Sequence, residues 1–491
     1  MNHHLIDLAW AVVVFVAHLL TALRALTRPN RSPASRIAWL AVIMLVPVAG
    51  MIGYLLLGET SIGRARMERV RKAEKSMALP PDEDFRPQQV TPMAASLFDL
   101  CSSINPFKVV SGNRITLLGD PDAPASEPKR NSLKAVDQLI ADIGLAQEQV
   151  HIAVYIWLDD DVGRRLAAAV CEAAQRGVTC RVMVDSLGSR DFIRSATFKQ
   201  MRSAGAHLHA TLADISRLRH MAFSRVDLRD HRKMVVIDNR IAFCGSQNFA
   251  SPEFRVKPKF APWIDVLLRI EGPLVRQMQY LFLSGWIPET GESGLEHLPA
   301  QSPVHPIENG CTAQAFKTGP TGRHNSMSDM FVACIYAARR ELLITTPYFV
   351  PDEPMLRALC AAAQRGVKTT LIFPKRNDSW LVGNACRSTY LDLLTSGVCV
   401  YEYPLGILHT KSMTLDGEIT LIGSANMDRR SLELNYENNL LIADAPFTRT
   451  IHERQQGYLS VSHPVQLEAV RAWPLHARLV QNVINMMAPV L

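Results

Sequence analysis

The chain has 491 residues, of which 48% are hydrophobic, and a formal net charge of +7 at pH 7. This length supports two or three domains with hydrophobic cores. The positive charge fits an anionic partner such as acidic lipid or nucleic acid, and equally an ordinary basic surface. The nine cysteines are scattered and form no CxxC pair, which argues against a disulfide framework and against a zinc site.

Two apolar segments open the chain, from Leu8 to Leu23 and from Ile37 to Leu57. The second runs for twenty-one residues without a charge, which is enough to cross a bilayer, whereas the first is borderline. A cleaved signal peptide fits less well, because Asp7 and no Lys or Arg precedes the first segment. We therefore predict a membrane-anchoring region over residues 1–60 with two transmembrane helices; a single span is the alternative.

Basic residues flank the second apolar segment on both sides. Four precede it and six follow it: Arg24, Arg28, Arg31 and Arg36, then Arg64, Arg66, Arg69, Arg71, Lys72 and Lys75. The positive-inside rule favours the side with more basic residues for the cytoplasm. We therefore predict a multi-pass protein of the cell inner membrane, with the N-terminus and the long C-terminal part in the cytoplasm.

A basic helical neck is predicted from about Arg64 to Met77, and a Pro- and acid-rich linker around Leu79 to Gln89, both within residues 61–110. The remainder repeats itself. In each copy a buried strand (150–155 and 342–347) precedes a helix that ends at a glycine, Gly177 or Gly366, before a second strand (179–184 and 368–373). The alternation predicts an α/β fold of two domains, 111–300 and 301–491, packed face to face around one shared active site.

The spacing of the repeats differs between the copies. The Cys/Arg-Gly block shifts by 189 residues, from Cys171 to Cys360, whereas the histidine motif described below shifts by 178. The first copy therefore carries an insertion of eleven residues, which we expect around Gly188 to Arg219.

One motif occurs twice: His231-x-Lys233-x4-Asp238 and His409-x-Lys411-x4-Asp416. Each copy is followed at the same offset by Gly-Ser-x-Asn, which adds Ser246, Asn248, Ser424 and Asn426. Phosphodiester chemistry without a metal needs such a set: one imidazole attacks phosphorus, a second serves the leaving and incoming alcohols, and Lys and Asn hold the phosphoryl oxygens. No His and carboxylate cluster has metal-ligand spacing, so we expect no catalytic metal and no cofactor.

Spacing within the motif separates the roles. A lysine two residues from its histidine points to the same side of an extended strand, where it can neutralise phosphoryl oxygens. The Ser and Asn pairs add donors for phosphate, although Gly-Ser-x-Asn is also good turn chemistry. Asp238 and Asp416 lie seven residues beyond their histidines, too far to touch them along a strand, so we interpret both as structural members of the motif.

The paired motifs resemble those of the phospholipase D superfamily, and further blocks resemble its bacterial cardiolipin synthases. These blocks run nearly from end to end: Ala38-Trp39-Leu40, Tyr54 to Glu59, Pro262-Trp-Ile-Asp265, Trp286 with Glu289 to Glu292, Thr346 to Glu353, Asp428-Arg-Arg-Ser431, and Asn435-Tyr-Glu437. Two positions depart from the family pattern, which commonly has Gly-Gly at the first Gly245-Ser246 and an Asp where this chain has Gly285.

The resemblance implies that one histidine forms a phosphatidyl-histidine intermediate while the other acts as acid and then base. The pseudo-symmetry of the copies leaves open which is the nucleophile; we favour His231. The family resemblance also implies that a downstream carboxylate binds each imidazole at Nδ1. The candidates are Asp265 and Glu437, about thirty residues beyond their histidines. A surface salt bridge is the alternative interpretation of Asp265.

The implied function is that of a membrane-embedded phosphatidyltransferase acting on membrane phospholipids. It would join two phosphatidylglycerol molecules into cardiolipin and release glycerol. A hydrolytic phospholipase D is the first alternative, because the motifs do not separate water from an alcohol as the acceptor. A nucleic-acid phosphodiesterase fits less well, because no aromatic residues interleave with a strong basic stripe. The amphipathic run Leu475 to Met487 fits either the membrane surface or, preferably, packing on the catalytic core.

Overall fold

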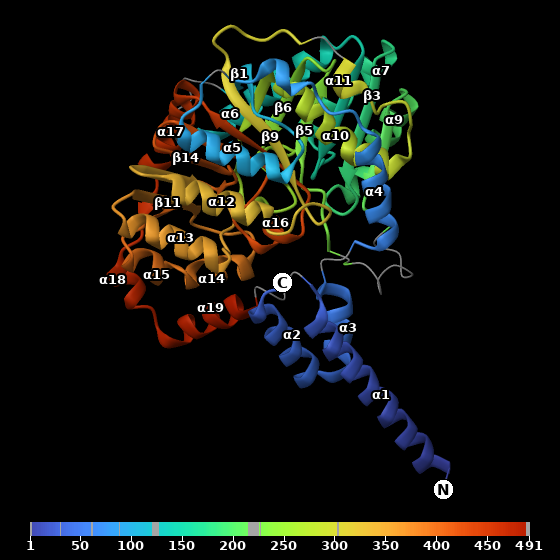
Figure 1. The fold of residues 1–491 in the computed structure, drawn as a ribbon, viewed down its shortest axis with the longest axis vertical. Coiled ribbons are helices and arrows are strands. Elements are labelled where there is room, and N and C mark those ends of the chain that lie inside the picture. Colours follow the sequence, from blue (N-terminus) through green and yellow to red (C-terminus); the bar gives the residue numbers. More distant parts are fainter. Residues whose placement is uncertain are drawn as a thin grey trace.

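The computed structural model describes residues 2–29, 31–59, 62–87, 89–119, 127–214, 225, 227–301 and 304–487. Figure 1 shows two adjoining α/β halves, from which a group of N-terminal helices projects at one side. The halves carry the repeated motifs, and the projecting helices carry the apolar segments.

One continuous sheet runs through both halves. In the first half the strand order is β1 (Val110–Leu117), β8 (Leu267–Glu271), β6 (Ile241–Gly245), β5 (Lys233–Ile237), β2 (Gln149–Val154), β3 (Thr179–Asp185) and β4 (His207–Thr211). In the second half it is β9 (Cys311–Thr318), β16 (Glu437–Ala443), β15 (Ile419–Gly423), β14 (Ser412–Leu415), β10 (Glu341–Thr345), β11 (Lys368–Pro374), β12 (Cys399–Tyr403) and β17 (His463–Pro464). The two orders match strand for strand up to β17, as expected for a duplicated α/β fold.

The halves meet differently from a simple face-to-face packing. Strands β1 and β9, each the first strand of its half, pair antiparallel, so the two sheets join edge to edge. Inner-face residues of both halves also share one apolar cluster, in which Met234 and Leu268 pack with Ile422 and Leu440. The prediction of two packed α/β repeats is therefore confirmed, with an added hydrogen-bonded seam between them.

Helices cover the sheet in both halves. In the first half these are α6 (Pro128–Gly144), α7 (Asp161–Gln175), α8 (Arg190–Arg194), α9 (Ala196–Ser203), α10 (Leu274–Thr290) and α11 (Leu298–Gln301), whereas α5 (Pro92–Ile104), which precedes β1 in the chain, packs on the second half. In the second they are α12 (Ser326–Ala337), α13 (Glu353–Gln364), α14 (Trp380–Ser388), α15 (Tyr390–Thr395), α16 (Arg429–Glu433), α17 (Ala445–Ser460), α18 (Leu467–Arg471) and α19 (Leu475–Met487). Short 3-10 turns lie at Asp82–Phe85 and Pro258–Phe260.

The repeated helix–glycine–strand unit forms as predicted. Helices α7 and α13 are each followed by a glycine with positive φ, 91° at Gly177 and 87° at Gly366, which ends the helix and turns the chain into the next strand. The insertion of the first copy lies later than predicted. His231 follows the end of β4 by twenty positions, whereas His409 follows the end of β12 by six, and part of the longer connection (215–224) is outside the described residues.

The first apolar segment forms a long helix, α1 (Asn2–Thr27), and among the described residues only its stretch Ile6–Thr27 is long and apolar enough to cross a bilayer. The second apolar segment does not form the single long helix that the two-span prediction requires. It forms two shorter helices, α2 (Pro33–Leu45) and α3 (Pro47–Leu57), which are about 20 and 16 Å long at 1.5 Å per residue. Neither matches the roughly 30 Å core of a bilayer.

Helices α2 and α3 fold back on each other at Val46. The Trp39 and Tyr54 rings meet edge to face with centroids 5.4 Å apart. A Cβ atom at Gly50 would lie 2.3 Å from the Val42 carbonyl oxygen, so only glycine permits this approach. Pro47 removes a helical donor next to the turn, which is the local reason for the break and is not visible in a count of apolar residues.

The open end of this hairpin is polar and faces the two α/β halves. Arg24 Nε, at the end of α1, donates to Glu59 at 2.5 Å, and Arg28 pairs with the same carboxylate. Arg31 donates to the Gly58 carbonyl at 2.7 Å and forms an ion pair with Glu433 of α16 at 3.1 Å. The end of α1, the start of α2 and the end of α3 therefore lie together.

The basic neck forms the predicted helix, α4 (Arg64–Ser76). Its Arg66 is buried and pairs with Asp214 and with Glu289 at the end of α10. The neck is thus bound to the first half.

Candidate active site

Backbone pairing places each motif histidine beside the opposite half. Strand β13 (Ile407–Leu408) pairs parallel with β7 (Trp263–Ile264), and the His409 amide donates to the Ile264 carbonyl at 2.8 Å. A matching bridge joins Asp230 and Tyr436, where the His231 amide donates to the Tyr436 carbonyl at 2.9 Å. Each histidine is therefore fixed one residue away from a carboxylate of the other half.

The imidazoles use these crossed carboxylates. His231 Nδ1 lies 2.8 and 2.9 Å from the two Glu437 oxygens, and His409 Nδ1 lies 2.6 Å from Asp265 Oδ1. Sequence order had suggested that each histidine pairs with the carboxylate about thirty residues beyond it, in its own copy. That pairing is corrected: the same carboxylates are used, but they are exchanged between the halves.

Burial sets the protonation of both histidines. It lowers the pKa of His231 to about 4 and of His409 to about 4, although Glu437 and Asp265 oppose the effect. The Asp265 and Glu437 carboxyls are also buried, which raises their pKa, but His409 and His231 outweigh this and hold each pKa below its ordinary value. At pH 7 each neutral imidazole therefore donates Nδ1–H to an ionised carboxylate and leaves the Nε2 lone pair free.

These shifts predict an acid-sensitive fold. An unfolded histidine titrates near about 6.5, so between about pH 6.5 and about pH 4 the unfolded chain binds protons that the folded chain does not. The free energy of unfolding should thus fall as the pH drops through this window. Thermal unfolding between pH 7 and pH 4.5 should show a smaller loss in the His231→Gln/His409→Gln variant than in the wild type. Equal losses in both would contradict the assignment, and His463→Gln, at an exposed position, should behave as the wild type.

The two motif lysines are buried beside the histidines. Lys233 Nζ donates to the His231 carbonyl at 2.9 Å, and Lys411 Nζ donates to the His409 carbonyl at 2.6 Å. Burial lowers the pKa of Lys233 to about 8 and that of Lys411 well below its ordinary value, while nearby carboxylates oppose the change. A bound phosphate would stabilise the cationic form of both ammonium groups.

The two motif serines do not lie as predicted. The Ser246 hydroxyl donates to Asp265 Oδ1 at 2.6 Å, and the Ser424 hydroxyl donates to Glu437. Both side chains are fully buried. These hydroxyls are therefore directed at the carboxylates that hold the imidazoles, and they fix the position of those carboxylates.

Both motif asparagines are buried. Asn248 Oδ1 accepts from the Ile156 amide at 3.3 Å, and Asn426 is held through its backbone amide by the Ser431 hydroxyl at 3.1 Å. The Asn426 Oδ1 atom is buried without a hydrogen-bond partner. This oxygen is an acceptor, so it can take a hydrogen bond from a hydroxyl, whereas only the Nδ2 group of the same side chain can donate to a phosphoryl oxygen.

Asp238 and Asp416 lie away from the imidazoles, at positions of positive φ (51° and 55°). The Asp238 carboxylate accepts from the backbone amides of residues 147–149 at 2.8–2.9 Å, and Asp416 does the same for residues 339–341 at 2.7–2.9 Å. Each therefore ties its hairpin turn to the start of a neighbouring strand, in agreement with the structural interpretation.

Aromatic side chains form walls that the motif spacing did not reveal. The Tyr155 ring meets His231 at a centroid distance of 4.8 Å, and Lys233 Nζ lies 5.2 Å from its centre. In the second half Tyr348 lies 6.4 Å from His409, and Trp263 lies 4.7 Å from it. Tyr155 and Tyr348 follow the carboxyl ends of β2 and β10, and that position was the available signal for them.

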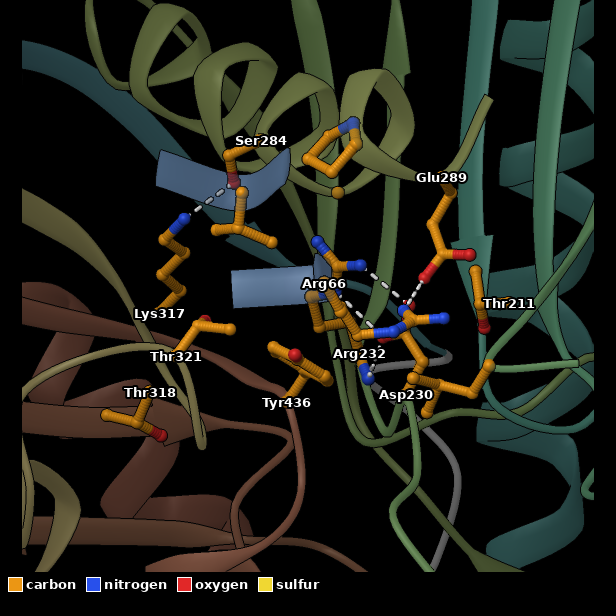
Figure 2. Close-up of a pocket in the computed structure, with 14 residues that line it drawn as sticks. Arg66, Thr211, Asp230, Arg232, Ser284, Glu289, Lys317, Thr318, Thr321 and Tyr436 are labelled. Carbon is orange, nitrogen blue, oxygen red and sulfur yellow. Dashed lines mark hydrogen bonds and ion pairs between the residues drawn. The ribbon is translucent and has the colours of Figure 1, made fainter. Parts of the chain in front are cut away.

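A small cavity of about 30 Å³ lies between the neck helix α4 and the residues that flank His231 (Figure 2). Arg232 forms a buried ion pair with Asp230 at 2.6 Å, and its guanidinium lies 6.0 Å from the Tyr436 ring centre. Asp230 and Tyr436 directly precede His231 and Glu437. A cavity of this size holds a water molecule or two and not a lipid, so it supports the site from behind.

The arrangement is suited to nucleophilic displacement at phosphorus. It offers imidazoles with free Nε2 atoms, two ammonium groups and two amides around one interface between the halves. Within the described part of the chain, no group of three or more His, Cys, Asp or Glu is placed to hold a metal ion. The residues present can supply a nucleophile, an acid–base group and charge stabilisation.

Comparison with known proteins agrees with this chemistry. The family described as cardiolipin synthase, PLD-like domain, matches residues 139–264 and 331–457, and a phospholipase D-nuclease N-terminal family matches residues 11–59. Cardiolipin synthase A of Klebsiella pneumoniae (strain 342) is 37% identical over 473 residues, 94% of each chain, and that of Cronobacter sakazakii (strain ATCC BAA-894) is equally similar.

Among solved structures, phosphatidylserine synthase of Haemophilus influenzae Rd KW20 superposes with a TM-score of 0.54 at 13% identity, covering 86% of this chain and 100% of that one. The two proteins therefore share a fold although their sequences differ widely. The match to both repeats, the N-terminal match and the near full-length identity agree with one another. The chain therefore belongs to the bacterial cardiolipin synthases of the phospholipase D superfamily.

Proposed function

We propose that the protein is a cardiolipin synthase that transfers a phosphatidyl group from one phosphatidylglycerol to another, releasing glycerol. The two halves build a single active site, because each imidazole is held by a carboxylate of the opposite half. This exchange is the observation that carries the proposal: neither half alone holds a complete histidine–carboxylate pair.

In the first step, His231 Nε2 attacks the phosphorus of the donor lipid. The anionic phosphodiester favours the imidazolium form of His409, which takes up a proton from water at Nε2 when the donor lipid binds. The bond from phosphorus to the headgroup glycerol oxygen breaks, and His409 gives this proton to that oxygen. In the second step, His409 removes a proton from a hydroxyl of the second phosphatidylglycerol, whose oxygen displaces His231 from phosphorus. Lys233, Lys411, Asn248 and Asn426 stabilise the charge on the phosphoryl oxygens. One phosphodiester replaces another, so no nucleotide is required.

The experiment uses the purified full chain in phosphatidylglycerol vesicles and counts cardiolipin and released glycerol together. Equal amounts of the two products are expected. Phosphatidic acid as the main product would overturn the transferase assignment in favour of hydrolysis. The His231→Gln/His409→Gln variant serves as the control for turnover by contaminating enzymes.

For membrane attachment, we propose that α1 crosses the bilayer once and that α2 and α3 enter it as a re-entrant hairpin. The hairpin turns at Val46, and its two polar ends meet the end of α1 at Glu59. All ten basic residues flanking the hairpin then lie on the side of the catalytic halves, whereas residues 2–7 contain no Lys or Arg. By the positive-inside rule the catalytic part lies in the cytoplasm and the N-terminus on the opposite side.

This arrangement predicts the labelling pattern of single cysteines in intact cells. A cysteine replacing His4 should react with a membrane-impermeant maleimide added from outside, whereas native Cys399, exposed on the catalytic part, should react only after the cells are opened. Val46→Cys should remain unlabelled from both sides. Protection of the His4 position in intact cells would contradict the single span and restore two crossings.

A further inference from the structure

The last helix, α19, has three distinct faces. Ile484 and Gln481 are buried, and Ile484 packs with Val350, Ala385 and Val382 of the second half. The polar residues Arg478, Asn482 and Asn485 lie to one side of this buried face. The remaining arc, about 140° wide at 100° per residue, presents the polar His476 among six exposed apolar side chains: Leu475, Leu479, Val480, Val483, Met486 and Met487.

Exposed apolar side chains also lie on the helix that packs against α19. Helix α14 packs against α19 and exposes Trp380 (66%) and Leu381 (41%). We call this combined surface of α14 and α19 the apolar patch. Exposed apolar side chains gathered on two packed helices mark an interaction site, and tryptophan is enriched where proteins meet the membrane–water interface.

The apolar patch adjoins the membrane-anchoring helices. Val350, which packs on Ile484 of α19, lies two residues before Asp352. Asp352 and Glu353 line a cavity together with Ser32 and Ser35 at the start of α2. Figure 1 shows α19 on the side of the catalytic halves from which α1, α2 and α3 project. The patch therefore continues the surface that the anchoring helices already bring to the bilayer.

Charge favours an anionic bilayer over another protein as the occupant. Helix α19 contains no Asp or Glu and carries Arg478 on its polar side. Lys375, Arg376 and Arg387 lie around the base of α14. An apolar face bordered by basic side chains is the arrangement of a helix that lies in the plane of a membrane with acidic headgroups.

The structure thus assigns α19 and α14 a second membrane contact: we propose that the apolar patch lies in the interface of an anionic bilayer, with α19 parallel to its surface. Asp378, two residues before Trp380, accepts a hydrogen bond from Tyr348 at 2.7 Å, and Tyr348 faces His409. The patch therefore sets the mouth of the site against the lipid surface. This role in substrate access rests on the proposed function, whereas the membrane contact itself does not.

The contact is tested by spin labels on the full chain, reconstituted in vesicles of equal parts phosphatidylglycerol and phosphatidylcholine. Labels are placed at Leu479→Cys and Val483→Cys, with Arg478→Cys as the matched control, after Cys360 and Cys399, the two cysteines that are not buried, are replaced by serine. Labels on the apolar patch should be reached by oxygen and shielded from a water-soluble nickel complex, and the control label the reverse.

Nickel access equal to that of the control would overturn the proposal. So would shielding from both reagents, which would indicate that a second protein copy covers the patch. This readout needs no turnover, so it distinguishes failure of the membrane contact from failure of the proposed reaction.

Measurements of turnover test the proposed role of the patch in substrate access. The Leu479→Glu/Val483→Glu variant should lose at least about fivefold in rate on phosphatidylglycerol vesicles and keep its rate on dispersed short-chain phosphatidylglycerol. Asn482→Gln, an exposed neutral position on the polar side of the helix, should change neither rate more than twofold, as a surface substitution. Unchanged vesicle turnover in the double variant would overturn the role in substrate access. If that variant loses both activities, the spin-label accessibilities still decide the membrane contact.

Discussion

Replacing either His231 or His409 by glutamine is expected to lower the rate of cardiolipin formation on the order of 10⁴-fold or more, because each step needs both imidazoles. The exposed His463→Gln variant should retain the wild-type rate, which controls for the loss of a histidine as such. Both active-site variants should remain folded, because glutamine fills a similar volume. Near-normal synthesis in either variant would exclude the two-histidine mechanism.

The same two variants separate nucleophile from acid–base group when the leaving group is changed. 4-Nitrophenolate is a weak base that departs from phosphorus without a proton, so a phosphatidyl 4-nitrophenyl ester does not need the acid in the first step. His409→Gln should then release a rapid burst of nitrophenolate and retain a covalent phosphatidyl group, because no base activates the acceptor. His231→Gln should release no burst. The opposite pattern would assign the nucleophile to His409.

Many of the candidate site residues could be predicted because they belong to motifs whose members lie within a few residues of one another. The duplicated His, Lys, Asp and Asn positions and the helix–glycine–strand units depend on local geometry, which a sequence preserves. Asp238 and Asp416 illustrate this: seven residues along an extended chain cannot return to the histidine, and both carboxylates indeed bind neighbouring backbone amides.

Features that depend on contacts between distant segments could not be predicted in this way. The exchange of Asp265 and Glu437 follows from pairing β7 with β13, segments about 144 residues apart, and no local spacing encodes it. The Ser246 hydroxyl donates to Asp265, between β7 and β8, and the motif spacing does not encode this contact either. The break at Val46 and Pro47 was hidden because a run of apolar residues gives the length of a segment but not whether it turns back.

The exchanged carboxylates lead to the second large effect. Glu437→Gln and Asp265→Asn should each lower the rate of synthesis on the order of 10³- to 10⁴-fold, because an amide facing Nδ1 can favour the tautomer that carries its proton on Nε2, where no lone pair is then left. The loss should be largest for Glu437, whose carboxylate also accepts from Ser431 at 2.8 Å and Asn435 at 3.2 Å. Glu433→Gln, four residues away and outside the site, is the matched control.

The burst with the nitrophenyl ester then tests the exchange itself. With His231 as nucleophile held by Glu437, Glu437→Gln should lose the burst together with turnover. Asp265→Asn should keep the burst and fail afterwards, because Asp265 holds the acid–base histidine of the other half. If each histidine depended on the carboxylate of its own copy, the two variants would exchange these phenotypes. A burst that is lost in Glu437→Gln and kept in Asp265→Asn would therefore mean that each half of the protein completes the active site of the other.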